Sequence, residues 1–179
     1  MQSIKVWDIF IRLFHGATAL FFLLNFFVTE DGGKLHSLLG YALLILIILR
    51  IVWGFIGSYH ARFDNFVPTS TQLKEHLKRQ FFRHQENHVG HNPLGALMVL
   101  NLLGSLALLS LTGILSETVF FWGMKWLEEL HEFLANYTML SVIFHLLGVV
   151  WETKRSKINL VKAMITGVKE MPEIIGKNR

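Results

Sequence analysis

Four long runs of apolar residues dominate this sequence and limit the kind of fold it can adopt. The third run, 94–115, has no charged residue over its 22 positions, and the fourth has 19 uncharged residues from Phe133 to Trp151. A helix needs about 20 apolar residues to cross the hydrocarbon core of a bilayer. We therefore predict an all-α membrane protein, a four-helix transmembrane bundle with spans at about 9–28, 35–56, 94–115 and 131–151.

Composition narrows the possible functions. The chain is 52% hydrophobic and 17% charged, which is too apolar for an ordinary soluble domain. Its 179 residues predict a single domain over 1–179. Cysteine is absent, which excludes thiolate-held iron–sulfur clusters and covalently attached c-type haem. Any bound cofactor must therefore be held by histidine or by packing.

Lysine and arginine are unevenly distributed between the segments that connect the spans. Of 17 such residues, two lie in the N-terminal lead through Arg12, five in 57–91 and seven in the tail, whereas the 29–34 loop and the 116–132 connector have one each. The positive-inside rule then predicts cytoplasmic N- and C-termini. Topology explains the basic residues, so we expect membrane lipid and not nucleic acid as a partner. Apolar residues at helical spacing in the tail predict an amphipathic surface helix over about 157–170.

Four histidines inside the spans sort into two pairs by depth. His131 and His145 are fourteen residues apart, which is about 21 Å of helical rise. Their directions from the helix axis differ by roughly 40°, so both lie on one face of the helix. His15 should lie at the inner level of His145, and His36 at the outer level of His131. Equal depth is what bis-histidine ligation of haem in a helical bundle requires. The pattern favours two haems, one above the other across the bilayer.

Other interpretations of these histidines remain open. They could be interhelical hydrogen-bonding groups, or proton relays in a cofactor-free transporter or channel. A purely structural membrane anchor would leave them without a role. A zinc or di-iron centre fits less well, because His131 and His145 are too far apart to share one metal and no span contains a Glu-x-x-His pair.

Two arginines accompany the histidines. Arg50 is fourteen residues after His36, on the same face but at the inner level, and Arg12 is one turn before His15. A buried guanidinium needs an anionic partner, and no acidic residue lies inside a span. A haem propionate is therefore a candidate partner for both. The alternative is that the side chains extend to the lipid headgroups, which we prefer for Arg12.

Several short motifs follow one another along nearly the whole chain. They are Val6-Trp7-Asp8 with Arg12 and His15, the His36 span ending in Arg50, the run Gly90-His91-Asn92-Pro93-Leu94-Gly95-Ala96, the His131/His145 pair, and the tail from Asn159 to Gly167. Together they resemble the bacterial cytochrome b561 family, which includes the b-type cytochrome subunit of nickel–iron hydrogenases. The resemblance implies a four-helix bundle with two b-type haems, ligated by His15, His36, His131 and His145.

The resemblance also implies electron exchange between the membrane quinone pool and a partner outside the bacterial cytoplasmic membrane. That partner would be a periplasmic redox protein such as a c-type cytochrome or a hydrogenase-like subunit. We assign no catalytic side chain, and leave open both a quinol or quinone oxidoreductase activity and a homodimer. A superoxide:quinone oxidoreductase of the same family would need a basic outer surface. Lys34 and Lys125 lie there among six acidic residues, which favours docking of a basic cytochrome instead.

Overall fold

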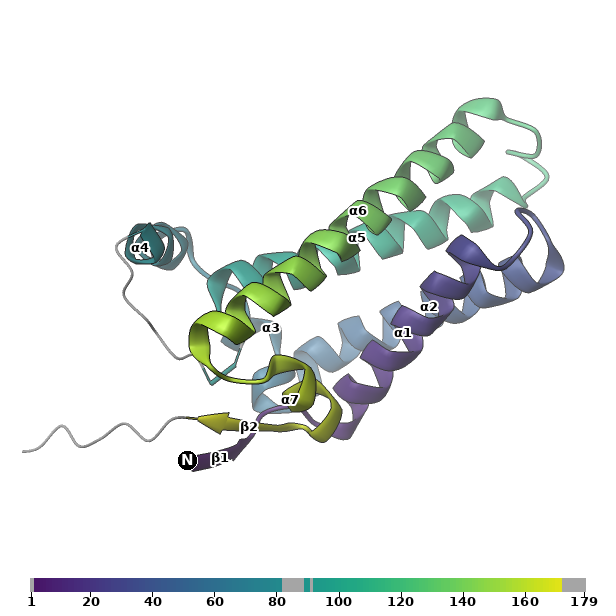
Figure 1. Cartoon of the computed structure of the whole chain (residues 1–179). Helices are drawn as coiled ribbons and strands as arrows, with labels where there is room; N and C mark the ends of the chain where they lie inside the picture. The colour runs from purple at the N-terminus through teal and green to yellow at the C-terminus, as the bar shows by residue number, and fades with distance from the viewer. Residues whose placement is uncertain (1, 82–88, 91, 172–179) are drawn as a thin grey trace, which may run out of the picture.

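The computed structural model describes residues 2–81, 89–90 and 92–171. Four helices in this part of the chain are long and apolar enough to cross a membrane: α1 (Ile9–Phe27), α2 (Lys34–Ile56), α5 (Pro93–Ser116) and α6 (Lys125–Ser156). α1 packs on α2, α2 on α5 and α5 on α6, which gives the bundle in Figure 1. The predicted four-helix membrane fold is confirmed.

The shorter elements gather at the end of the bundle that carries the N-terminus (Figure 1). They are β1 (Gln2–Lys5), η1 (Tyr59–Ala61), α3 (Phe63–Phe66), α4 (Ser70–Phe81), α7 (Leu160–Thr166) and β2 (Val168–Met171). We call this the inner end, after the orientation predicted from charge. The opposite end, with the turn after α1 and the connector before α6, is called the outer end.

The spans bury little of their own surface. Between 17% and 28% of the most apolar stretch of each span is buried inside the protein. Large apolar side chains such as Phe55 and Trp151 are exposed. Lipid is the solvent that such a surface requires. All four spans contribute to one central apolar cluster, which consists of Phe22, Leu43, Ile47, Leu106, Leu109 and Leu134.

α6 is longer than the sequence predicted. It begins at Lys125, six residues before the predicted start at His131, and it continues for 32 residues to Ser156. Residues 125–130 contain no helix breaker, and Glu128 in the first turn complements the helix dipole. At about 48 Å the helix exceeds the hydrocarbon thickness of about 30 Å. His131 therefore lies within a continuous helix and not at its first turn.

The two ends of the chain meet at the inner end. β1 and β2 pair antiparallel, with Gln2 opposite Met171 and Lys5 opposite Val168. The backbone N–H groups of Val6 and Trp7 donate to the Gly167 carbonyl at 2.9 and 3.1 Å. These contacts join the N-terminal motif to the tail motif, so the two motifs form one structural unit.

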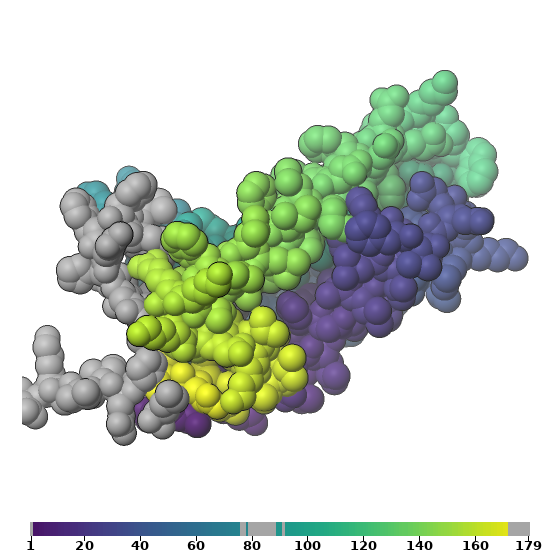
Figure 2. Space-filling view, in the orientation of Figure 1, coloured from purple at the N-terminus to yellow at the C-terminus, as the bar shows by residue number. Residues whose placement is uncertain are grey.

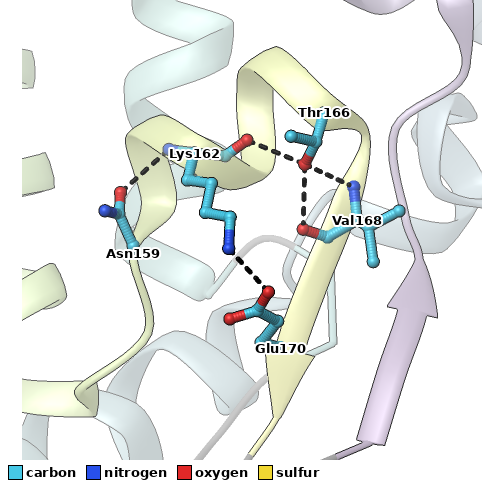
Figure 3. A network of polar contacts seen from close by, with 5 residues as sticks. All are labelled: Asn159, Lys162, Thr166, Val168 and Glu170. Carbon is cyan, nitrogen blue, oxygen red and sulfur yellow. Dashed lines mark hydrogen bonds and ion pairs between the residues drawn. The ribbon is translucent and has the colours of Figure 1, made fainter.

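The tail helix is shorter than the predicted surface helix over 157–170. Asn159 caps the start of α7 by accepting from the Lys162 N–H, and Gly167 ends it in the left-handed conformation. Figure 3 shows this cap and the ion pair of 2.7 Å between Lys162 and Glu170 on β2. The residues after Gly167 form a strand because β1 offers them a backbone partner.

Two ionisable side chains hold the inner end together. Asp8 caps α1 and accepts hydrogen bonds from Trp53 Nε1 and the Ser58 hydroxyl. Burial by itself would raise the pKa of Asp8, but these hydrogen bonds outweigh it and hold the pKa below its ordinary value. Lys169 is buried and donates to the carbonyls of Val89 and Gly90. Its burial lowers its pKa to about 8, against the opposing effect of Glu152.

We predict that Gly167→Ala destabilises the fold much more than Gly32→Ala. Both glycines have positive φ, 81° and 70°, which costs an alanine about 1–2 kcal/mol. A Cβ on Gly167 would also lie 2.6 Å from the Trp7 carbonyl oxygen, whereas one on Gly32 would meet nothing within 4 Å. Thermal unfolding in detergent measures the difference. Equal losses in the two variants would contradict a tight contact between the chain ends.

The buried Lys169 predicts a pH dependence of stability. Its pKa is about 8 in the folded protein against an ordinary value of 10.5, so between these values the unfolded chain binds more protons. The free energy of unfolding should therefore rise with pH across this window. Methionine does not titrate, so Lys169→Met lacks this contribution. The free energy of unfolding of the native protein minus that of Lys169→Met should therefore increase as the pH is raised from about 8 to 10.5. A constant difference would contradict the lowered pKa.

Candidate functional site

The structure brings the four histidines of the spans together as two pairs. His36 on α2 and His131 on α6 have ring centroids 6.1 Å apart at the outer end. His15 on α1 and His145 on α6 have centroids 6.3 Å apart toward the inner end. α6 thus contributes one imidazole to each pair. Figure 2 shows α6, in green, beside α1, in purple, along the face of the molecule turned to the viewer.

The imidazoles bridge helices whose backbones are not closely packed. Within the described residues, α6 packs along α5 but has no extensive backbone contact with α1 or α2. A Cβ built on Gly16, Gly40 or Gly148 would meet no atom within 4 Å. Gly16 follows His15 and Gly148 is three residues after His145, so a flat group could approach the backbone beside these histidines.

The separation within each pair fits a metal with axial imidazole ligands. A ligating imidazole nitrogen lies about 2 Å from its metal, so two rings on opposite sides of one ion have centroids about 6 Å apart. A bare ion such as zinc needs about four protein ligands in a structural site. No group of three or more His, Cys, Asp or Glu residues that could hold a metal occurs in the described residues. Two imidazoles per site therefore suit a metal whose other ligands come from a macrocycle.

The outer histidines are held by threonines. The Nδ1 atom of His131 is 3.0 Å from Thr112 Oγ1 on α5, and Nδ1 of His36 is 3.1 Å from Thr29 Oγ1 in the turn after α1. Both contacts occupy Nδ1 and leave Nε2 as the nitrogen available to a metal. A hydrogen bond at the second nitrogen is the usual way in which proteins orient a metal-ligating histidine.

A glycine allows α5 to approach His131. A Cβ on Gly113 would lie 2.9 Å from His131 Cε1, closer than real Cβ atoms come to a neighbour. Any side chain at residue 113 would therefore push the imidazole away. Thr112 and Gly113 together fix where this ring can lie.

No pattern in the sequence singles out Thr29, Thr112 or Gly113 as part of a site. Thr29 lies in the turn after α1, and Thr112 is 19 residues before His131 in the chain. No spacing rule links residues on different helices. His91, in the motif before α5, lies outside the described residues.

Arg50 lies inside the protein and does not extend to the membrane surface. It is 3% exposed, and its Nη2 donates to the Ala61 carbonyl at 3.0 Å. The rings of Phe63 and Phe66 on α3 lie 5.2 and 5.9 Å from its guanidinium carbon. Its second terminal nitrogen, Nη1, is buried without a hydrogen-bond partner. Arg12 is partly buried, and its Nε likewise has none.

The buried side-chain atoms without hydrogen-bond partners belong to the three helices that carry the histidines. In the described residues they are Arg12 Nε, Thr18 Oγ1, Arg50 Nη1 and Thr138 Oγ1. Arg12 and Thr18 are three residues before and after His15, and Thr138 is seven residues from both His131 and His145. Arg50 is fourteen residues after His36. By helical geometry each of them lies within roughly 60° of a histidine on its own helix.

Such a concentration has a physical meaning. A buried polar atom that makes no hydrogen bond costs about 1–3 kcal/mol, and each instance calls for an explanation such as an absent ligand. Here all four atoms occur on the histidine-bearing faces. The residues present therefore fit a polar cofactor bound between those faces.

Comparison with known proteins places the chain in a family. The family model described as prokaryotic cytochrome b561 matches residues 6–167. The probable Ni/Fe-hydrogenase B-type cytochrome subunit of Rhizobium leguminosarum bv. viciae is 28% identical over 158 residues, covering 74% of this chain. The match covers 66% of that relative, just under two thirds of its length. No solved structure gives a significant match.

If the outer histidine pair binds haem, Gly113→Ala should lose it, because the new Cβ would displace His131. Gly104→Ala on the same helix is the matched control, since its Cβ would meet nothing within 4 Å. Haem per chain is measured from a reduced-minus-oxidised spectrum of each purified variant. Retention of full haem in Gly113→Ala would contradict this account of the site.

Proposed function

This chain belongs to the prokaryotic cytochrome b561 family, and we propose that it is a di-haem cytochrome that carries electrons across the bacterial cytoplasmic membrane. Membership of the family implies b-type haem and membrane electron transfer. Our proposal adds two haems per chain, His36 and His131 as the ligands of the outer one, and His15 and His145 as the ligands of the inner one.

The observation that carries the proposal is the spacing of the two pairs. Ring centroids at 6.1 and 6.3 Å agree with the separation of about 6 Å expected for two imidazoles on opposite sides of one metal. A histidine relay for protons would not need two pairs with the same separation. A structural anchor would not need the histidines at all.

Arg50 and Arg12 are proposed to bind haem propionates. A propionate would accept hydrogen bonds from Arg50 Nη1 and Arg12 Nε, which are buried without a hydrogen-bond partner. Phe63 and Phe66 stack on the Arg50 guanidinium, and its Nη2 is bonded to the Ala61 carbonyl. The side chain is thereby held in one orientation, with Nη1 left to bind the anion.

When bound, haem supplies the one-electron redox chemistry, and the chain supplies position and environment. His131 and His145 would hold the two haems at levels separated by about 21 Å of helical rise on α6. The apolar cluster around Phe22 and Leu134 lies in the core of the bundle and excludes water. No side chain is required to act as an acid or base in electron transfer itself.

The proposed electron donors and acceptors are membrane quinone or quinol and a periplasmic redox protein. Six acidic residues at the outer end are exposed: Glu30, Asp31, Glu117, Glu128, Glu129 and Glu132. This surface would attract a basic partner such as a small c-type cytochrome. The relative named as a hydrogenase cytochrome subunit supports a redox protein as the partner class. The same negative charge would repel superoxide, so we rank a superoxide oxidase below electron transfer.

The proposal is tested by counting haem in the purified protein and in histidine variants. We expect two b-type haems per chain, with His131→Ala and His145→Ala each retaining one. His60→Ala in η1, outside the spans, is the matched control and should retain both. A single haem in the unaltered chain would contradict the two-site proposal. Colourless protein despite adequate haem supply would favour the proton relay instead.

A further inference from the structure

We infer that Thr29 and Thr112 are positioning residues. Through their hydrogen bonds to Nδ1, they make the Nε2 atoms of the outer histidine pair more basic metal ligands than those of the inner pair. The inference rests on the proposed haem ligation and goes beyond it. It assigns a direction to each of the two threonine–histidine hydrogen bonds and predicts a difference between the two sites. The direction follows from counting hydroxyl protons.

Thr112 has one hydroxyl proton and two neighbouring groups. Its Oγ1 is 2.9 Å from the Leu109 carbonyl oxygen and 3.0 Å from His131 Nδ1. We assign the hydroxyl proton to the Leu109 carbonyl oxygen, which can only accept. With that assignment, Thr112 Oγ1 accepts from the Nδ1–H of His131. This selects the tautomer in which Nε2 carries the lone pair that a metal requires.

The same count applies to Thr29. Its Oγ1 lies 3.1 Å from the Asn25 carbonyl oxygen and 3.1 Å from His36 Nδ1. The Asn25 side chain donates through Nδ2 to the His36 carbonyl, which turns its Oδ1 toward Thr29 at 3.4 Å. Both Asn25 oxygens only accept, and we assign the Thr29 proton to the nearer one, the backbone carbonyl. His36 Nδ1–H therefore donates to Thr29.

Each threonine that bonds to a histidine comes from the helix, or the turn after it, next to the helix that carries that histidine. His36 is on α2 and is held by the end of α1 and its turn, whereas His131 is on α6 and is held by α5. The two antiparallel helix pairs thus each hold one imidazole of the outer pair at its Nδ1 atom. Preorientation of this kind leaves less rotational freedom to be lost when a metal binds.

The inner pair has no such hydrogen bond. Within the described residues neither His15 nor His145 makes a hydrogen bond through its imidazole ring. An imidazole that donates from Nδ1 is more basic at Nε2, which stabilises the oxidised iron. The threonines therefore lower the reduction potential of the outer haem, and their removal should raise it.

The test is a redox titration of Thr112→Val and Thr29→Val in the His145→Ala background, which retains only the outer haem. Valine keeps the shape of threonine and removes the acceptor. We expect the outer potential to move upward in each variant, with the largest shift when both are combined. Thr112→Ser, which restores a hydroxyl, should return the potential toward the starting value.

Thr118→Val is the matched control, because Thr118 also donates to a helix carbonyl at the outer end but contacts no histidine. The same variants in a His131→Ala background should leave the inner potential unchanged. An unchanged outer potential in both valine variants, or an equal shift in Thr118→Val, would overturn the inference while leaving haem ligation intact. Absence of haem from the unaltered chain would instead overturn the proposed function.

Discussion

The hydrocarbon core of a bilayer offers no hydrogen-bond partner. Polar groups in the spans therefore have to form their hydrogen bonds within the protein or with a bound group. The spans are continuous helices, so their backbones satisfy themselves. Hydroxyl groups bond back to their own helices, as Ser105 does to Leu102 and Ser116 to Thr112. Between α5 and α6, Asn101 joins Ser141 and Tyr137 in a polar network. The exceptions among the described residues lie on α1, α2 and α6, the helices that carry the histidines, where a bound polar group would supply the missing partners.

α6 determines the spacing of the whole site. It carries one histidine of each pair, and the rise of a helix separates them by a fixed amount. α1 and α2 each contribute one partner, so each site forms between α6 and a helix that it does not pack against closely. A distance set by helical rise does not depend on loops. The proposed electron path would therefore keep its length even if the outer connector moves.

The two ends of the bundle are built differently. At the inner end the β1–β2 pair, Asp8, Lys169 and the buried Arg50 tie together segments from both ends of the chain. The outer end consists of short turns with exposed acidic side chains. Glu117 accepts hydrogen bonds from Ser37 and Tyr41 on α2, and these hold the pKa of Glu117 below its ordinary value. The acidic outer end is the surface on which we propose that a basic partner docks.

The sequence by itself determined the four spans and the pairing of His15 with His145 and of His36 with His131 by depth. Both follow from local rules, since helical rise and bilayer thickness depend on position along one segment. It could not determine the start of α6 at Lys125, because no breaker marks the boundary between connector and span. Only the tertiary structure decided that Thr112 meets His131 and that Phe63 covers Arg50. Those contacts depend on how each helix is rotated against its neighbour, and packing between residues far apart in the chain sets that rotation.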